Sequence, residues 1–241
     1  MTSVTAPAPP FAGQADPKPR LWTADEFQRL LESGFFLDPR LELIDGVITT
    51  RDSAKARSWT ADEVYRLSDL GFFQDQRVEL IGGEILLMSP QLNIHALGIT
   101  LTADALSVIF ALGYWVRVQM TLDLSPLSLA DPDVAIVRGS PRSHASNRAN
   151  PTTALLVAEI SESTLSYDRG RKASLYAASA IQDYWIINLV HKQVEVHRNP
   201  VADPSQPFGW HYADVTILHQ GEFIIPLAAP QSKVAVDDLL P

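Results

Sequence analysis

The stretches Ala-Asp-Pro-Asp-Val-Ala-Ile-Val (130–137) and Ala-Leu-Leu-Val-Ala-Glu-Ile-Ser (154–161) carry most of the information on the fold. Both are short and almost continuously apolar, which is typical of central strands buried on both faces of a sheet. Each has a carboxylate beside or within its apolar run, Asp133 in the first and Glu159 in the second. A charge next to a buried strand costs free energy unless a partner compensates it. These two acids are therefore the first candidates for a functional site.

A cation follows on the next predicted helix. The stretch Tyr-Asp-Arg-Gly-Arg-Lys-Ala-Ser-Leu-Tyr (167–176) contains Lys172, and we expect a helix over about 168–179. Mg²⁺ prefers carboxylate oxygens and usually takes only one or two of them, together with several waters. Such a metal can activate water, and a lysine can neutralise charge on a transferring phosphoryl group. A third candidate acid, Glu79, also interrupts an apolar strand. Plain strand ends or caps are the alternative for all these acids.

The rest of the chain mixes helices and strands without strict alternation. Apolar spacing predicts a helix from Asn93 to Leu112, and the alternating stretch Tyr114–Leu124 predicts one strand that is buried on one side. Further strands are expected at 184–189, 193–198, 212–218 and 222–226. This order predicts an α/β or α+β fold with a mixed sheet flanked by helices.

An internal duplication occupies the N-terminal part. Residues 22–48 (copy one) align without a gap on residues 59–85 (copy two), so that WTADE and GFF occur in both. Each copy predicts a helix with a capping box and then a hairpin with a two-residue turn. We expect a disordered tail over 1–20, an extra copy of the helix–hairpin segment over 21–56, and the main domain over 57–241.

Composition limits the classes of function. The chain of 241 residues has no cysteine, which excludes disulfides, thiolate metal sites and cysteine nucleophiles. No secretory signal or convincing membrane span is found, so we expect a soluble cytoplasmic protein. The net charge of −9 argues against a general nucleic-acid coat protein. Local basic residues could nevertheless contact DNA, or they could simply be solvated: Arg138, Arg142, Arg148, Arg169 and Arg171.

Several motifs occur in a characteristic order. They are Glu-Leu-Ile-x-Gly-Glu (79–84), a helix with an early histidine, Pro-Asp (132–133), Val-x-Glu-Ile-Ser-x-Ser-Thr (157–164), Tyr-Asp-x-x-x-Lys-x-x-x-Tyr (167–176) and Asp-Tyr-Trp-Ile-Ile (183–187). From about Trp59 to Arg198, this order resembles the Uma-type restriction endonucleases of the PD-(D/E)XK nuclease superfamily. The resemblance implies a restriction-endonuclease-like core and hydrolysis of DNA phosphodiester bonds with Mg²⁺, for which Mn²⁺ could substitute.

The resemblance also implies roles for individual residues. Asp133 would be the acid of the Pro-Asp motif, Glu159 the second metal-binding acid, and Glu79 a further acid on the first hairpin. Position 161 is serine where the simple superfamily motif has lysine. The family places its lysine on the following helix, which points to Lys172 for positioning or activating water.

Two readings compete with a metal-dependent endonuclease. A non-catalytic nucleic-acid-binding or assembly module on the same fold would agree with the acidic charge and the extra N-terminal copy. A glycosidase with a carboxylate pair has little support, because it needs no lysine. A homodimer is compatible with cutting two strands. For His95, a hydrogen bond to a neighbouring strand is favoured over a catalytic role.

Overall fold

The computed structural model of the chain describes residues 16–36, 38, 40–51, 55–145 and 150–241. Its helices are α1 (Ala24–Glu32), α2 (Ala61–Asp69), α3 (Asn93–Ile109), α4 (Pro141–His144), α5 (Leu165–Tyr167) and α6 (Ala173–Ala178), with a π-helical turn η1 (Asp168–Lys172) and a 3₁₀ turn η2 (Val236–Asp238). Its strands are β1 (Lys18–Pro19), β2 (Leu41–Ile44), β3 (Val47–Thr50), β4 (Val78–Ile81), β5 (Glu84–Leu87), β6 (Tyr114–Val118), β7 (Leu122–Ser125), β8 (Ser128–Ala130), β9 (Val134–Arg138), β10 (Leu156–Ser161), β11 (Asp183–Asn188), β12 (Gln193–Ala202), β13 (Trp210–His219), β14 (Phe223–Ile224) and β15 (Val234–Ala235). Among the described residues, no helix has the length and apolar character needed to cross a membrane.

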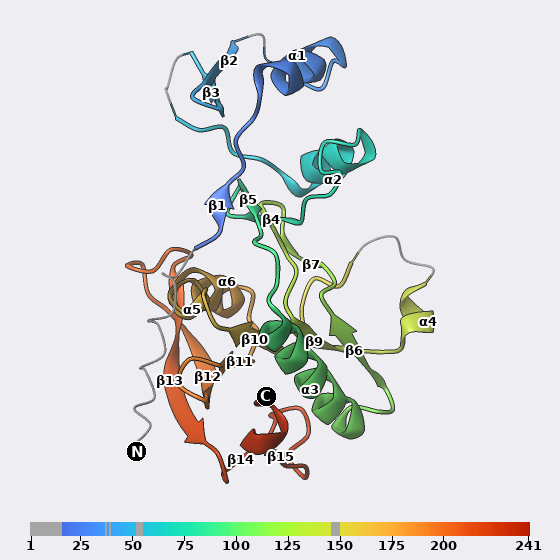
Figure 1. Cartoon of the computed structure of the whole chain (residues 1–241), viewed down its shortest axis with the longest axis vertical. Coiled ribbons are helices and arrows are strands. Elements are labelled where there is room, and N and C mark those ends of the chain that lie inside the picture. Colours follow the sequence, from blue (N-terminus) through green and yellow to red (C-terminus); the bar gives the residue numbers. More distant parts are fainter. Residues whose placement is uncertain (1–15, 37, 39, 52–54, 146–149) are drawn as a thin grey trace, which may run out of the picture.

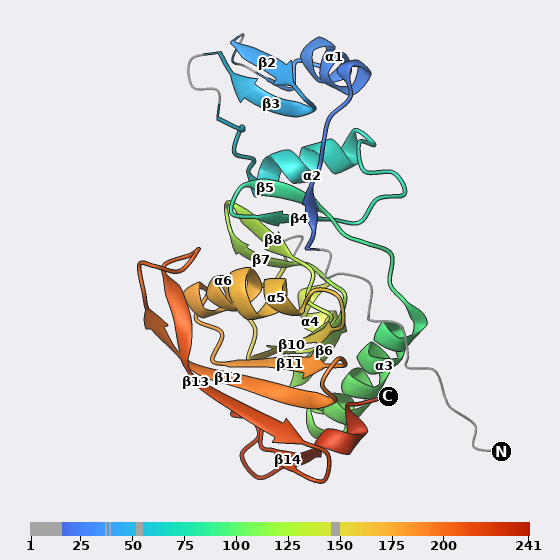
Figure 2. The same cartoon turned by 60° about the vertical axis from the view of Figure 1, so that its left-hand side comes forward.

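The main sheet confirms the predicted mixed architecture. Within the described chain its strand order is β13-β12-β11-β10-β9-β6, and β10 and β11 form the parallel pair while the other neighbours are antiparallel. Alternate residues of β10 face two separate cores. Val157 packs in the core that includes the α6 residue Leu175, and Leu156 packs in the core that includes the α3 residue Leu106. The α5–α6 segment and α3 thus cover opposite faces of the sheet (Figures 1 and 2).

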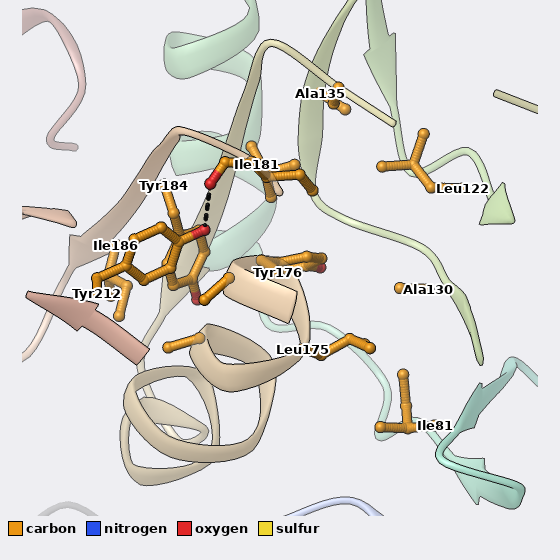
Figure 3. Packing of buried hydrophobic residues seen from close by; sticks show 14 of the residues in the cluster. Ile81, Leu122, Ala130, Ala135, Leu175, Tyr176, Ile181, Tyr184, Ile186 and Tyr212 are labelled. Carbon is orange, nitrogen blue, oxygen red and sulfur yellow. Dashed lines mark hydrogen bonds between the residues drawn. The ribbon is translucent and has the colours of Figure 1, made fainter. Parts of the chain in front are cut away.

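Aromatic side chains hold the α5–α6 segment on the sheet (Figure 3). The rings of Tyr176 and Tyr184 have centroids 5.0 Å apart, and Tyr184 stacks on Tyr212 at 5.9 Å. The Tyr212 hydroxyl donates a 2.8 Å hydrogen bond to the carbonyl of Ile181. Because these rings are buried and their hydroxyls are satisfied, they anchor the helix without leaving polar atoms unpaired.

A second sheet carries the hairpin of copy two. Its described strands run in the order β1-β5-β4-β8-β7, and β4 meets β8 where Leu80 pairs with Leu129. The single strand predicted over 114–124 is wrong. The strand is interrupted at Gln119, whose φ of 50° is incompatible with extended backbone. As a result, β6 joins the main sheet and β7 joins the second sheet.

The local predictions for the duplicated segment are confirmed. Thr23 and Thr60 each form a capping box, with Glu26 and Glu63 respectively. Both hairpins have two-residue turns, at Asp45-Gly46 and Gly82-Gly83, in which all four residues have positive φ. That backbone matches the twist of the flanking strands, which explains why glycine is placed there.

Other boundaries differ from the expectations. The expected tail over 1–20 lies outside the described residues up to residue 15, but Lys18 and Pro19 pair with β5 and Arg20 is buried. Ordered chain therefore begins before residue 21. The helix α3 ends at Ile109 rather than Leu112, and the helix expected from 168 begins at Leu165 and contains the π-helical turn.

A buried carboxylate on β12 links the main sheet to η1. Glu195 accepts hydrogen bonds from Arg169 Nε (2.8 Å), Arg169 Nη2 (2.7 Å) and Asn188 Nδ2 (2.7 Å). Burial acts to raise the pKa of Glu195, but contacts with His197, Arg169 and Asn188 outweigh it and hold the pKa well below its usual range. The charged form of Glu195 therefore stabilises the folded state.

We predict that Glu195→Gln lowers the free energy of unfolding at pH 7 by about 1–3 kcal/mol, the scale of hydrogen bonds to a charged group. The lower end is expected, since the Arg169 side chain is 43% exposed. A depressed carboxyl pKa stabilises only above the unfolded value of about 4.3, so the difference from the parent should shrink as the pH falls below about 4. Urea unfolding at several pH values measures this, with exposed Asp214→Asn as the control. A difference that stays constant down to pH 3 would contradict the assignment.

Candidate active site

The two strand acids lie side by side in the main sheet. Antiparallel β9 and β10 pair Val134 with Ala158, and one step further along this register brings Asp133 next to Glu159. The backbone N–H of Asp133 donates to Glu159 Oε2 at 3.3 Å. The side chains of Asp133 and Glu159 are both almost fully buried. The apolar runs noted in the sequence thus place these two carboxylates at one point.

Lys172 completes the arrangement from the helical layer. It is the last residue of the π-helical turn, and its ammonium donates to Glu159 Oε1 at 2.9 Å and to Glu79 Oε1 at 3.2 Å. Burial acts to lower the pKa of Lys172, but the charges of Glu159 and Glu79 raise it well above its usual value. The lysine is therefore a permanent cation at neutral pH.

Glu79 reaches the site from the second sheet. It lies on β4, and its Oε1 also accepts a 3.0 Å hydrogen bond from the backbone N–H of Asp131. Its other oxygen, Oε2, is buried without a partner in the described structure. Burial raises the pKa of Glu79 to about 7, against the attraction of Lys172 and with added repulsion from Glu159. An orphaned carboxylate oxygen in such a place is a vacant acceptor.

Two further side chains bond to the acids. His95, in the first turn of α3, lies with Nε2 3.2 Å from Asp133 Oδ2, in agreement with the expected hydrogen bond to a neighbouring strand. The hydroxyl of Tyr176 donates to Glu159 Oε1 at 2.5 Å. The spacing of four residues predicts that Tyr176 shares a helix face with Lys172, but no sequence pattern predicted its hydrogen bond to Glu159.

The electrostatic balance differs between the two main acids. Burial acts to raise the pKa of Asp133, but the hydrogen bond and charge of His95, together with Lys172, bring it below its usual value. The pKa of Glu159 is raised, because burial and the charge of Asp133 outweigh Lys172 and Tyr176. Asp133 is therefore the more firmly ionised of the pair.

A pocket opens onto these groups. Its lining includes Asp133, Glu159, Lys172 and His95, and its volume of about 90 Å³ holds several water molecules or a hydrated cation. Sequence reasoning did not nominate three other polar residues of the lining, although each lies close in sequence to a predicted site residue: Arg77, Asp131 and Asp168. The lining also includes Glu162, whose charge beside Glu159 the sequence already shows.

The donor set of the pocket fits a hard divalent cation. Acidic side chains outnumber cations, and burial together with the charge of Glu159 raises the pKa of Asp168 to about 7. Added positive charge would relieve this repulsion. The described residues contain no ready-made group of three His, Cys, Asp or Glu ligands. Mg²⁺ does not need one, since one or two carboxylates and several waters suffice.

The predicted basic residues do not gather at the pocket. Arg138 ends β9, about 17 Å along the strand from Asp133, and Arg142 lies beyond it on α4. Arg169 is paired with Glu195, and Arg171 with Glu84 at 2.5 Å. Arg148 lies outside the described residues. Their contact with DNA stays a prediction.

Comparison with protein families identifies the chain. The model of the Uma2 family, described as "Putative restriction endonuclease", matches residues 61–237. The chain belongs to the Uma2 family. This membership supports a nuclease function in general and confirms the resemblance noted in the sequence. The match covers residues 61–85 of copy two and no part of copy one. In copy one the residue equivalent to Glu79 is Glu42, which is partly exposed and lies 3.9 Å from Arg51.

A solved structure has the same fold as this Uma2 protein. It is described as "a putative nuclease belonging to DUF820 from Anabaena variabilis", and it superposes with a TM-score of 0.53 at 14% sequence identity. The match covers 75% of this chain and 96% of that one. A comparison with curated proteins gave no match. The predicted mixed α+β fold, with sheets flanked by helices, is thereby confirmed.

We predict that Lys172→Met lowers the free energy of unfolding by about 3–5 kcal/mol at pH 8, because it leaves buried carboxylates without their cation. Without the lysine, the pKa values of Glu79 and Glu159 rise further above those of the unfolded chain. The folded variant then binds more protons than the unfolded chain, so the deficit should shrink as the pH falls from 8 to 5. Urea unfolding at both pH values measures it, beside the exposed Lys233→Met. An equal deficit at both pH values would show that Lys172 acts by packing alone.

Proposed function

We propose that this Uma2 protein is a Mg²⁺-dependent endonuclease that hydrolyses phosphodiester bonds of DNA. The observation that carries the proposal is the buried lysine, Lys172, held between Glu159 and Glu79 at a pocket that also exposes Asp133. A cation fixed among acids suits a reaction in which negative charge develops on a phosphoryl group. A carboxylate-pair glycosidase would have no use for it.

Each side chain has a distinct role in the proposal. Asp133 and Glu159 would hold the metal, with Glu79 as a third acid, and Mn²⁺ would be an effective substitute. When bound, the metal would supply an activated water and neutralise charge on the phosphate. The ammonium of Lys172 positions the attacking water or stabilises the charge that develops on the phosphoryl oxygens. Its direction is set by its two hydrogen bonds, which cost nothing to reorganise during the reaction.

The surrounding residues keep the acids in place. The backbone N–H of Ile160 donates to Asp133 Oδ2 at 2.9 Å, while His95 lies against the same carboxylate. The Tyr176 hydroxyl donates to Glu159 Oε1, the same oxygen that accepts a hydrogen bond from Lys172. These contacts hold the carboxylates in one orientation before substrate binds, as a preorganised site requires.

We predict that the purified protein nicks supercoiled plasmid in the presence of Mg²⁺ or Mn²⁺, and that Asp133→Asn lowers the rate at least about 100-fold. The asparagine oxygen can still accept the bond from Ile160, so the fold should survive the change. The measurement is the initial rate of conversion to open-circular plasmid, with circular dichroism of both proteins to compare their folds.

The controls separate chemistry from folding. Asp214→Asn, an exposed change on β13 remote from the pocket, should keep the parental rate. Chelation by EDTA should stop cleavage, and added Mg²⁺ should restore it. Cleavage that persists in Asp133→Asn would contradict the proposed site. Absence of cleavage by parent and variant alike, on plasmid and on single-stranded DNA, would favour the non-catalytic binding module.

A further inference from the structure

The two copies of the duplicated segment pack against each other. The helix and hairpin of copy one lie beyond those of copy two, at the end of the molecule remote from the main sheet (Figures 1 and 2). Trp22 of copy one stacks on Trp59 of copy two with centroids 5.0 Å apart. These two residues occupy the same position in their copies, and both are buried in one hydrophobic cluster to which both copies contribute. Equivalent residues thus meet face to face.

Several other side-chain contacts between the copies occur in exchanged pairs. Trp22 contacts Phe72 at 5.9 Å, and the equivalent contact of Trp59 with Phe35 is 6.3 Å. Arg29 lies over the ring of Phe72 at 4.5 Å, as the equivalent Arg66 lies over Phe35 at 4.5 Å. These contacts from copy one to copy two are therefore matched by equivalent contacts from copy two to copy one.

The main chain follows the same rule. The backbone N–H of Arg20, just before copy one, donates to the carbonyl of Ile85 in copy two at 2.8 Å. The equivalent Arg57, just before copy two, donates to the carbonyl of Ile48 in copy one, also at 2.8 Å. The residues before the helix of each copy thus form a backbone hydrogen bond with the hairpin of the other copy.

Contacts of the form i–j with matching j–i are the signature of an isologous interface, in which two identical surfaces meet about a two-fold axis. Here the axis relates two segments of one chain. We propose that the pairing face of copy two, formed by Trp59, Arg66, Phe72 and the edge of β5, is a docking surface for a second copy of the same segment. Copy one occupies it in place of a second chain.

The chemistry of the face supports this occupant. Trp59 and Phe72 are 5% and 6% exposed with copy one in place, and large aromatics like these each bury about 150–250 Å². Left uncovered, they would form an apolar patch with an open strand edge, which soluble proteins avoid. A surface that carries the same aromatic and arginine positions satisfies these exchanged contacts. The duplication supplies that surface within the chain.

The proposal predicts that breaking the contact of copy one turns the protein into a homodimer. In Trp22→Asp/Phe35→Asp, copy one can no longer dock, so the pairing face of copy two is free to meet the same face of another chain. Light scattering after size exclusion should give one chain mass, 26.5 kDa, for the parent and twice that for the variant. The matched control is Leu21→Asp/Leu31→Asp, two leucines of the same segment that are 58% and 42% exposed, and it should stay at one chain mass.

Engineered cysteines test the same point without relying on mass, because the chain has none of its own. In the proposed homodimer, Ala56 of one chain faces Leu86 of the other, just as Pro19 faces Leu86 here. Ala56→Cys/Leu86→Cys should therefore form a covalent dimer under oxidation in the Trp22→Asp/Phe35→Asp background. It should stay uncross-linked in the parental background, where copy one separates the two positions.

Two results would overturn the proposal. One is a Trp22→Asp/Phe35→Asp variant that keeps its circular dichroism and stays at one chain mass without cross-linking. The other comes from Pro19→Cys/Leu86→Cys in the otherwise parental chain, which does not depend on the folding of the aspartate variant. These residues are direct antiparallel partners, so the proposal requires a disulfide within one chain. A covalent dimer there would mean that copy one of another chain occupies the face.

Discussion

The buried ion cluster around Lys172 is the constraint on which the rest of this structure depends. A charge removed from water is tolerated only when paired and hydrogen-bonded, and the partners of this lysine come from two different sheets. Glu159 is provided by the main sheet and Glu79 by the second sheet, while the lysine itself is carried by the helical layer. The two sheets and the helix must therefore all be in their final places before Lys172, Glu159 and Glu79 are all paired. The same requirement keeps the pocket polar and acidic, which suits a cation.

The second sheet must also bury an apolar side of its own, because its hairpin belongs to a copy of the duplicated segment. On one side of that copy Glu79 pairs with Lys172, and on the other side Trp59 and its neighbouring aromatics pack against copy one. One side is satisfied by charge pairing and the other by burial of rings against copy one. The duplication thus covers one side of the hairpin, while Glu79 on the other side pairs with Lys172. Copy one brings no site of its own, since its Glu42 meets no equivalent of Lys172 among the described residues.

Local signals in the chain were sufficient for local structure. Capping boxes, two-residue turns and apolar runs predicted the two helices, both hairpins and the central strands, because each depends on residues close in sequence. The motifs also nominated three residues that line the pocket, Asp133, Glu159 and Lys172, and Glu79, which pairs with Lys172. The interruption of the strand at Gln119 was not predicted, because the alternation of apolar residues continues across it although the extended backbone conformation ends there. The hydrogen bond from Tyr176 to Glu159 was not predicted either, since it depends on how a helix packs on a sheet.

By itself, the sequence determined the family and the duplication, and it nominated the acids and the lysine. These follow from the order and spacing of residues along one dimension. Only the tertiary structure decided that Asp133 and Glu159 share one register, that Glu79 crosses from another sheet to Lys172, and that Arg169 is paired with Glu195. It also decided that copy one packs on copy two with exchanged contacts. The reason is physical: pairing of charges and matching of surfaces depend on distances in space, which residue spacing along the chain does not specify.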